Sequence, residues 1–365
     1  MEITKKLILK SLSTVEEPDL KQDLVTLNMI KDVNVVANKV AFTVILTTPA
    51  CPLKEVIRQR CEDAITRDLG EDLQITINMI ADVTRVQDQL NTALPNVKNI
   101  IAIASGKGGV GKSTIAANLA VALAKTGANV GLIDADIYGP SIPVMFGLED
   151  DKPAIVEEDG KSLVIPIRKY GVELISMGFL SPADNAIVWR GPMASSALRQ
   201  FFNDVKWPEL DYLLIDLPPG TSDIHLTMVQ SASITGAVIV TTPQKVALAD
   251  AQKGLAMFKQ PQINVPVLGV IENMAYFTPE DLPNKKYYIF GEGGGDKLAK
   301  KHNVPLLGKI PIVEQIREAG DDGSPIVLSN NIVAQAFTSL AEAVAQQVAI
   351  RNASIPESQQ VKITT

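Results

Sequence analysis

The sequence predicts an α/β chain of two domains. A small α/β domain comes first, followed by a larger one with a mostly parallel sheet covered by helices on both faces. The 365 residues are 46% hydrophobic, enough to bury more than one large core. From residue 99 onward, short apolar runs alternate with helical stretches, as is typical of such sheets. A glycine-rich loop between the first apolar run and an apolar helix indicates a ligand site.

Residues 1–84 are expected to form the small domain. Their apolar spacing switches between the period of a helix and that of a strand. The expected elements are a helix at 3–13, strands at 33–37 and 40–47, a helix at 52–69 and a strand at 73–80. The polar stretch at 85–98, which includes Leu94-Pro95-Asn96, is the expected linker.

Residues 99–349 are expected to form the larger domain, and residues 350–365 a polar tail. The expected strands lie at 99–104, 130–133, 212–215, 237–241 and 267–271. Apolar runs without alternation are typical of strands that are buried on both faces. In such a sheet, ligands bind at the carboxyl ends of the strands, so the residues there are the first candidates for a site.

The net charge and the cysteine count exclude several classes of function. A formal charge of −7 argues against nucleic acid or an anionic membrane as a partner. The chain starts without an apolar signal segment, and no stretch approaches the roughly 18 apolar residues of a membrane span. A cytoplasmic protein is therefore expected. Two cysteines are too few for a disulfide framework, so both are expected to be reduced.

Residues 106–113 match the phosphate-binding pattern G-x-x-x-x-G-K-[ST]. Glycines let successive backbone N–H groups turn toward phosphate oxygens. Lys112 neutralises charge on the outer phosphates, and Ser113 offers a hydroxyl to Mg²⁺. The expected nucleotide contacts are Gly106, Lys107, Gly108, Gly109, Val110, Gly111, Lys112, Ser113 and Thr114.

Three aspartates stand at the carboxyl ends of two predicted strands. Asp216 follows four residues of an apolar strand, as in the Walker B arrangement, in which the carboxylate holds Mg²⁺ directly or through water. Asp134 and Asp136 follow another strand, where one carboxylate supports the metal and the other orients an attacking water. The alternative for Asp216 and for Asp136 is a carboxylate that only caps the following turn. Hydrolysis is expected to be slow, because no arginine finger is identifiable.

Lys107 distinguishes this loop from the general phosphate-binding pattern. The run from Lys107 to Thr114 resembles the deviant Walker A motif of the family that includes MinD, ParA and the nitrogenase iron protein. The resemblance implies a P-loop NTPase fold that uses ATP and Mg²⁺. It also implies a homodimer in which the first lysine reaches the nucleotide of the partner subunit. Lys107, Lys112 and Asp136 are the expected catalytic residues.

Further strings narrow the resemblance to the Mrp/ApbC-type ATPases, which carry iron-sulfur clusters. The strings begin at Asp134, Trp189, Asp216, Glu272 and Ile289. The resemblance implies that Asp136 orients the water, that Ser113, Asp134 and Asp216 form the Mg²⁺ region, and that Asn273 contacts the adenine. It also implies apo iron-sulfur proteins and cluster-assembly factors as partners.

The chain departs from this family where the cluster is expected. Such carriers have a Cys-x-x-Cys between the Glu-Asn-Met and Ile-Phe-Gly strings, whereas this sequence reads Tyr276 to Tyr288 there without a cysteine. No cysteine follows Cys61, and iron-sulfur clusters need thiolate ligands. His225 and His302, the only histidines, are expected to have surface or capping roles.

The amino-terminal domain resembles the small domain that precedes many such ATPases, with the run from Thr48 to Pro52 as its matching motif. Cys61 falls on the apolar face of the expected helix, so it is expected to be an inert core residue. Cys51 precedes Pro52 and is expected to be the N-cap of that helix, where the helix dipole favours the thiolate. Cys51 is therefore the candidate iron-sulfur or thiol site. An unreactive cap is the alternative.

Three functions stay open at this point. The first is an ATPase that binds and transfers an iron-sulfur cluster. The second is a MinD/ParA-like positioning ATPase, for which the expected basic carboxyl-terminal helix is missing, because Glu342 is the only charge from Ile332 to Ile350. The third is a scaffold that uses ATP only to join two subunits.

Overall fold

The computed structural model describes residues 3–84, 93–137, 139–180, 191–279, 282 and 285–354. The chain divides into two compact units, Met1–Val86 with Ala349–Thr365, and Gln87–Val348. Of the expected linker, residues 85–92 lie outside the described residues, and its last residues already belong to the strand β6 (Val97–Ser105). The expected tail begins too early, because the helix α10 (Ile332–Ser354) continues through Arg351 and Ala353, both good helix formers.

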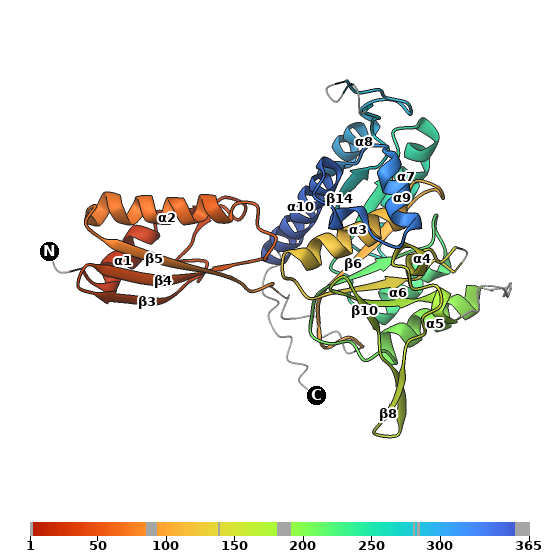
Figure 1. Cartoon of the computed structure of the whole chain (residues 1–365), viewed down its shortest axis with the longest axis horizontal. Coiled ribbons are helices and arrows are strands. Elements are labelled where there is room, and N and C mark those ends of the chain that lie inside the picture. The colour runs from red at the N-terminus through yellow and green to blue at the C-terminus, as the bar shows by residue number, and fades with distance from the viewer. Residues whose placement is uncertain are drawn as a thin grey trace. The chain divides into compact units, whose positions relative to one another are not determined.

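The small unit contains a three-stranded sheet of β3, β4 and β5, a two-stranded sheet of β1 and β2, and the helices α1 and α2 (Figure 1). Its elements are α1 (Lys5–Leu12), β1 (Glu16–Glu17), β2 (Gln22–Asp23), β3 (Ile30–Val36), β4 (Lys39–Leu46), α2 (Lys54–Leu69) and β5 (Gln74–Ala81). In the sheet, β4 pairs with β3 antiparallel and with β5 parallel. Buried side chains such as Ile8, Phe42 and Ile57 form its core. The helices and strands predicted for this unit are present, with shifted ends.

The start of α2 changes the place of Cys51. The helix begins at Lys54 with Leu53 as its N-cap, whereas the sequence predicted Cys51 as the N-cap. Pro52 and Leu53 form a turn, and the Lys54 N–H donates to the Cys51 carbonyl oxygen at 3.4 Å. The fixed φ of proline suits a turn as well as a first helical position. The predicted N-cap role of Cys51 is therefore wrong, and the helix-dipole argument for its thiolate no longer holds.

The larger unit is built on an eight-stranded sheet in the order β10-β11-β7-β12-β6-β13-β14-β15. The strands not yet given are β7 (Val130–Asp134), β10 (Ile167–Lys169), β11 (Val172–Ser176), β12 (Leu210–Asp216), β13 (Gly236–Thr241), β14 (Val267–Glu272) and β15 (Leu306–Lys309). Neighbouring strands are parallel except for β10 and β11, which pair antiparallel. The predicted, mostly parallel sheet is confirmed.

Helices flank this sheet, and a hairpin extends from it (Figure 1). The helices are α3 (Lys112–Lys125), α4 (Ile142–Met145), α5 (Gly191–Asn203), α6 (Asp223–Ser231), α7 (Lys245–Phe258), α8 (Gly294–His302), α9 (Glu314–Asp321) and α10. Two 3₁₀ turns (Met177–Leu180, Ile326–Leu328) and the hairpin strands β8 (Ile155–Glu158) and β9 (Lys161–Val164) complete the described elements. Among the packed pairs, α3 contacts β7 and β12, and α7 contacts β13 and β6.

The central strands explain where the site lies. In β7 and β13 every residue is buried, as their uninterrupted apolar runs predicted. Since β7, β12 and β6 are parallel neighbours, their carboxyl ends meet at one edge of the sheet. In this register Asp216 at the end of β12 lies directly opposite Asp134 at the end of β7. The sheet thereby brings together the strand-end aspartates and the loop that follows β6.

Candidate functional site

The loop between β6 and α3 is shaped by its glycines. Gly109 and Gly111 have φ values of +78° and +80°, a region that side chains with a Cβ rarely adopt. At Gly106 a Cβ would lie 2.0 Å from the backbone carbonyl carbon of Asp250 in α7, so only glycine fits there. The loop ends at the N-terminus of α3, where free backbone N–H groups attract anions.

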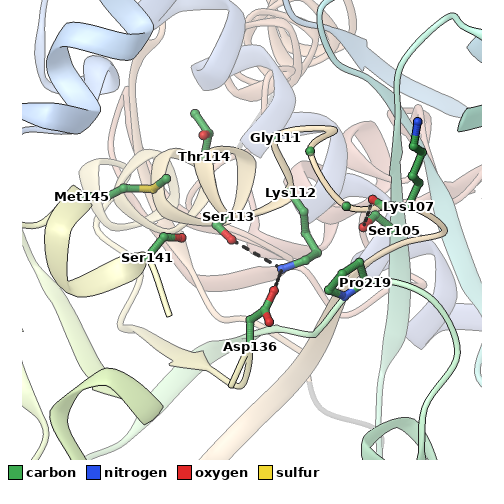
Figure 2. A pocket seen from close by; sticks show the side chains of 12 residues that line it. Ser105, Lys107, Gly111, Lys112, Ser113, Thr114, Asp136, Ser141, Met145 and Pro219 are labelled. Atoms are coloured by element: carbon green, nitrogen blue, oxygen red, sulfur yellow. Dashed lines mark hydrogen bonds and ion pairs between the residues drawn. The ribbon is translucent and has the colours of Figure 1, made fainter. Parts of the chain in front are cut away.

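A cavity of about 230 Å³ opens along this loop (Figure 2). The residues that line it are Ser105, Lys107, Gly108, Gly109, Gly111, Lys112, Ser113, Thr114, Asp136, Ser141, Met145 and Pro219. Most of the predicted loop contacts and Asp136 are therefore at one cavity. Ser105, Ser141, Met145 and Pro219 were not predicted. Ser105 ends β6, Pro219 follows the end of β12, and Ser141 and Met145 belong to the cap and the end of α4, the helix that follows β7.

Lys112 is the centre of the polar contacts in this cavity. Its side chain is 6% exposed, and its Nζ donates to Asp216 Oδ1 at 2.7 Å. The same Nζ lies 3.5 Å from Asp136 Oδ2 and donates to Ser113 Oγ at 3.4 Å (Figure 2). A buried ammonium needs such partners. Without them, its removal from water would destabilise the fold by several kcal/mol. Four of the predicted site residues are therefore in direct contact.

Asp216 keeps one carboxylate oxygen for a further partner. The residue is fully buried, and no described residue donates a hydrogen bond to its Oδ2. Burial raises the pKa of its carboxyl, and the ammonium of Lys112 opposes that rise. A buried oxygen without a partner, close to the hydroxyl of Ser113, fits the oxygen ligands that Mg²⁺ prefers. The residues present thus fit a magnesium ion bound with a nucleotide.

Asp134 is bound on both of its oxygens. Its Oδ1 accepts from the backbone N–H of Asp136 at 3.2 Å, and its Oδ2 accepts from Ser176 Oγ at 2.8 Å and from Ile142 N–H at 3.3 Å. Burial, and then the neighbouring charge of Asp216, raise the pKa of Asp134 to about 8. These bonds fix the segment that carries Asp136. Ser176, the polar partner from β11, could not be predicted because its strand is distant in sequence.

Lys107 and Asn273 have different surroundings. Lys107 is exposed, and Figure 2 shows its ammonium directed away from that of Lys112. Asn273 is 5% exposed, and its Nδ2 donates to the Val110 carbonyl oxygen at 2.8 Å. In this structure Asn273 supports the loop backbone, while its contact with the adenine stays a prediction.

His225 has a capping role, as expected, but it is fully buried rather than at the surface. It is the third residue of α6 and forms a capping box with Ser222, the N-cap. A Ser-x-x-Glu or Ser-x-x-Gln pattern would have indicated this box from the sequence, whereas histidine at the third position is not the usual signal. His302 is partly exposed at the end of α8, and its carbonyl oxygen accepts from Lys259 Nζ at 3.0 Å.

The two cysteines have different surroundings within the small unit. Cys61 is fully buried, and burial raises the pKa of its thiol to about 12, as expected for an inert core residue. Cys51 is partly buried against the same core. Among the residues that the structure describes, no group of three or more His, Cys, Asp or Glu side chains could hold a metal ion. A cluster bound at Cys51 would therefore need ligands from outside this described set.

Comparison with known proteins places these features in a family. The model of the NUBPL iron-transfer P-loop NTPases matches residues 96–348, and that of an iron-sulfur cluster assembly protein matches residues 5–77. The chain belongs to the NUBPL iron-transfer P-loop NTPase family. Its predicted resemblance to iron-sulfur carriers with a small amino-terminal domain is thereby confirmed.

Relatives of this NTPase carry a consistent description. The iron-sulfur cluster carrier proteins of Synechocystis sp. and Deinococcus radiodurans are 48% and 46% identical to it. The alignments cover 95% and 96% of this chain and 99% and 97% of those proteins. A nucleotide-binding protein from Archaeoglobus fulgidus, solved in complex with ADP, is 41% identical with a TM-score of 0.55. That match covers 66% of this chain and 92% of the solved one. None of the described helices of this NTPase is long and apolar enough to cross a membrane.

Proposed function

We propose that this NTPase is an ATP-hydrolysing carrier that binds an iron-sulfur cluster and transfers it to apo-proteins. The observation that carries the proposal is the buried Lys112, held by Asp216 and Asp136 beneath a phosphate-binding loop. The family match and the names of the relatives support the cargo. Cluster-assembly factors are the proposed donors of the cluster. The MinD/ParA-like alternative is not favoured, since the relatives are described as carriers.

In the proposed hydrolysis, a water attacks the γ-phosphorus of ATP, the bond to the β–γ bridging oxygen breaks, and ADP and phosphate leave. Asp136, on the cavity wall, accepts a hydrogen bond from that water and orients it. Lys112 neutralises phosphate charge, and the loop N–H groups from Gly106 to Thr114 bind the phosphate oxygens. A bound Mg²⁺ would add charge neutralisation. Ser113 and Asp216 would hold it, with Asp134 fixing the adjoining segment.

The proposed assembly is a homodimer joined through the nucleotides. Lys107 lies on the loop, is exposed and points away from Lys112, so its ammonium is available to a second subunit (Figure 2). The cytoplasm is the proposed location. Hydrolysis is proposed to be slow, since no arginine finger is identified among the described residues at the cavity.

The proposed cluster site involves Cys51, because Cys61 is the only other cysteine of the chain and is buried. Cys51 is partly exposed at the turn that precedes α2. One thiolate per subunit cannot complete a cluster site, since clusters are commonly held by four ligands. The remaining ligands are proposed to come from a second subunit, a small thiol or the apo-protein that receives the cluster.

The experiment is an anaerobic reconstitution with iron and sulfide, in which bound iron and ATP turnover are measured on the same samples. Cys51→Ala is expected to lose the iron and keep the turnover. Asp136→Asn is expected to lose at least about a hundredfold of the turnover, the usual contribution of such a group, and keep iron and nucleotide binding. Cys61→Ala is the control, because it removes a thiol but leaves Cys51, the proposed cluster site, in place.

Three results would contradict the proposal. If the wild type holds no more iron than Cys51→Ala, or cannot activate an apo-protein, the carrier function is lost. If Asp136→Asn hydrolyses ATP like the wild type, the water-orienting role is lost. An absence of turnover in the wild type would leave ATP as a structural link between subunits, the scaffold function.

A further inference from the structure

We infer that His225 is a positioning residue of the nucleotide site. It holds the loop 217–222, which joins Asp216 to α6, in the conformation that presents Pro219 to the cavity and fixes the end of β12. The inference deepens the proposed function and rests on it, because it concerns the Mg²⁺-nucleotide site formed by Asp216. Nothing in the glycine loop or in the strand-end aspartates requires a histidine at this place.

Two backbone hydrogen bonds join the loop 217–222 to β6 among the described residues. At its start, Leu217 N–H donates to the Ile103 carbonyl oxygen at 3.1 Å, continuing the pairing of β12 with β6. In its middle, Gly220 N–H donates to the Ser105 carbonyl oxygen at 2.8 Å, which ties the loop to the residue that precedes the phosphate-binding loop. Gly220 itself has a φ of +82°, so the chain turns there. The end of the loop depends on Ser222.

Ser222 is held by the imidazole of His225. The Ser222 backbone N–H donates to His225 Nδ1 at 3.2 Å, and Ser222 Oγ lies 3.3 Å from the same nitrogen. The backbone N–H of His225 donates to the Ser222 carbonyl oxygen at 3.1 Å. Nδ1 also lies 3.2 Å from the Ser222 carbonyl oxygen, so the neutral ring bonds Ser222 in either tautomer, accepting from its backbone N–H or donating to its carbonyl oxygen. This pair closes the first turn of α6 and fixes the end of the loop.

The other nitrogen of the ring forms no hydrogen bond within the described part of the chain. Nε2 is buried, and no described residue is its hydrogen-bond partner. The edge of the imidazole packs on Phe258, with the ring centroids 6.1 Å apart. The hydrogen bonds of this side chain within the described structure are therefore directed to Ser222, while Phe258 sets the plane of the ring.

Histidine differs here from the usual third residue of a capping box, which is Glu or Gln. Burial, and then the charge of Lys112, contribute to lowering the pKa of His225 to about 4, so the ring is neutral at physiological pH. A glutamate would place another carboxylate near Lys112, which already pairs with Asp216 and Asp136. A neutral acceptor caps the helix without competing for the ammonium that the phosphates need.

The test measures the Mg²⁺ concentration that half-saturates binding of a fluorescent ATP analogue to the full chain. His225→Phe keeps a ring against Phe258 and removes the acceptor, and His225→Ala is used if the larger ring is not tolerated. Either variant is expected to need about tenfold more Mg²⁺, the lower end of the effect of losing a hydrogen-bond partner of a metal ligand, because His225 acts on Asp216 only through the loop. His225→Gln restores an acceptor and is expected to restore the wild-type value.

The matched control is Asn331→Ala, which removes the bond from Ala334 N–H to Asn331 Oδ1 at 2.8 Å at the start of α10. This substitution removes a helix cap and leaves the loop 217–222 unchanged. If His225→Phe and His225→Ala shift the Mg²⁺ dependence no more than Asn331→Ala, or if His225→Gln does not restore it, the inference is overturned. A wild type whose nucleotide binding ignores Mg²⁺ would instead contradict the proposed function, so the two failures are distinguishable.

Discussion

Two aspartates at adjacent strand ends have different surroundings, although the sequence presents them alike. Asp134 accepts three hydrogen bonds and has a pKa raised to about 8, whereas Asp216 bonds Lys112 through one oxygen and keeps the other without a described partner. Asp134 is thus suited to fixing the segment of Asp136, and Asp216 to meeting a cation. A strand followed by an aspartate predicts the location of such residues but cannot separate these roles, because the donors come from Ser176 and Ile142.

The intersubunit role of Lys107 is tested by Lys107→Ala. The side chain is exposed, so its loss should change the free energy of unfolding by no more than about 0.5 kcal/mol. If Lys107 contacts the nucleotide of a second subunit, the variant stays monomeric with ATP under conditions in which the wild type dimerises. Light scattering on a sizing column with and without ATP measures this. Lys297→Ala, which removes another exposed lysine, should dimerise like the wild type; ATP-dependent dimers of Lys107→Ala would refute the assignment.

At the level of elements, the phosphate-binding loop and α7 approach each other more closely than any side chain would allow. A Cβ at Gly106 would overlap the backbone of Asp250, and Gly254, one turn further along α7, faces Gly106 with its own open side. The loop conformation therefore depends on the position of a helix whose start lies more than 130 residues later in the chain. The sequence pattern indicates that phosphate binding requires glycine at 106, but it does not show that packing against α7 requires glycine there too.

This contact predicts that Gly106→Ala destabilises the fold as well as the site. Backbone atoms have to move, and such overpacking typically costs about 1–3 kcal/mol or more. Gly108→Ala is the matched control, because its Cβ would meet only Pro219 Cγ, at 3.8 Å. Urea unfolding compares the two. Equal midpoints would mean that α7 adapts to the extra atom, and that the packing described here does not restrict residue 106.

In the larger unit, the strands predicted from the sequence are ones that are buried on both faces. Continuous apolar runs predicted the central strands, and the spacing of glycines and lysine predicted the phosphate-binding loop. The edge strands β10 and β15 were missed because they are short and only partly buried, and the exposed hairpin β8–β9 has no apolar run of that kind. The inner strand β11 was also missed, although four of its five residues are buried, because Glu173 interrupts its short apolar run. The start of α2 was placed too early because Pro52 fits a turn and a helix equally well. The contacts of Lys112, Asn273 and His225 join distant segments, so no local pattern contains them.

For the whole molecule, His225 makes the free energy of unfolding depend on pH in the acid range. Its pKa falls from an ordinary 6.5 to about 4 in the folded protein, so between these values the unfolded chain binds more protons. Stability from this group is complete above the unfolded pKa and is lost as the pH falls toward about 4, a loss of about 3 kcal/mol.

The variant His225→Gln isolates this effect, since it keeps an acceptor but does not titrate. Chemical unfolding of the wild type and the variant near neutral pH and near pH 4 gives the comparison. The difference in stability between them should move in favour of the variant as the pH falls. A constant difference across this range would show that the histidine does not titrate with a shifted pKa.

The positions of the two cysteines allow the opening of the small unit to be measured without an added probe. Both thiols of the chain lie in residues 1–84, and Cys61 is sealed in the core of that unit, whereas no residue after it carries a thiol. A thiol reagent can therefore readily modify only Cys51 in the folded chain. It reaches Cys61 only when the small unit opens. The rate at which Cys61 is labelled therefore measures the opening of the small unit, and it does not report on the nucleotide-binding unit.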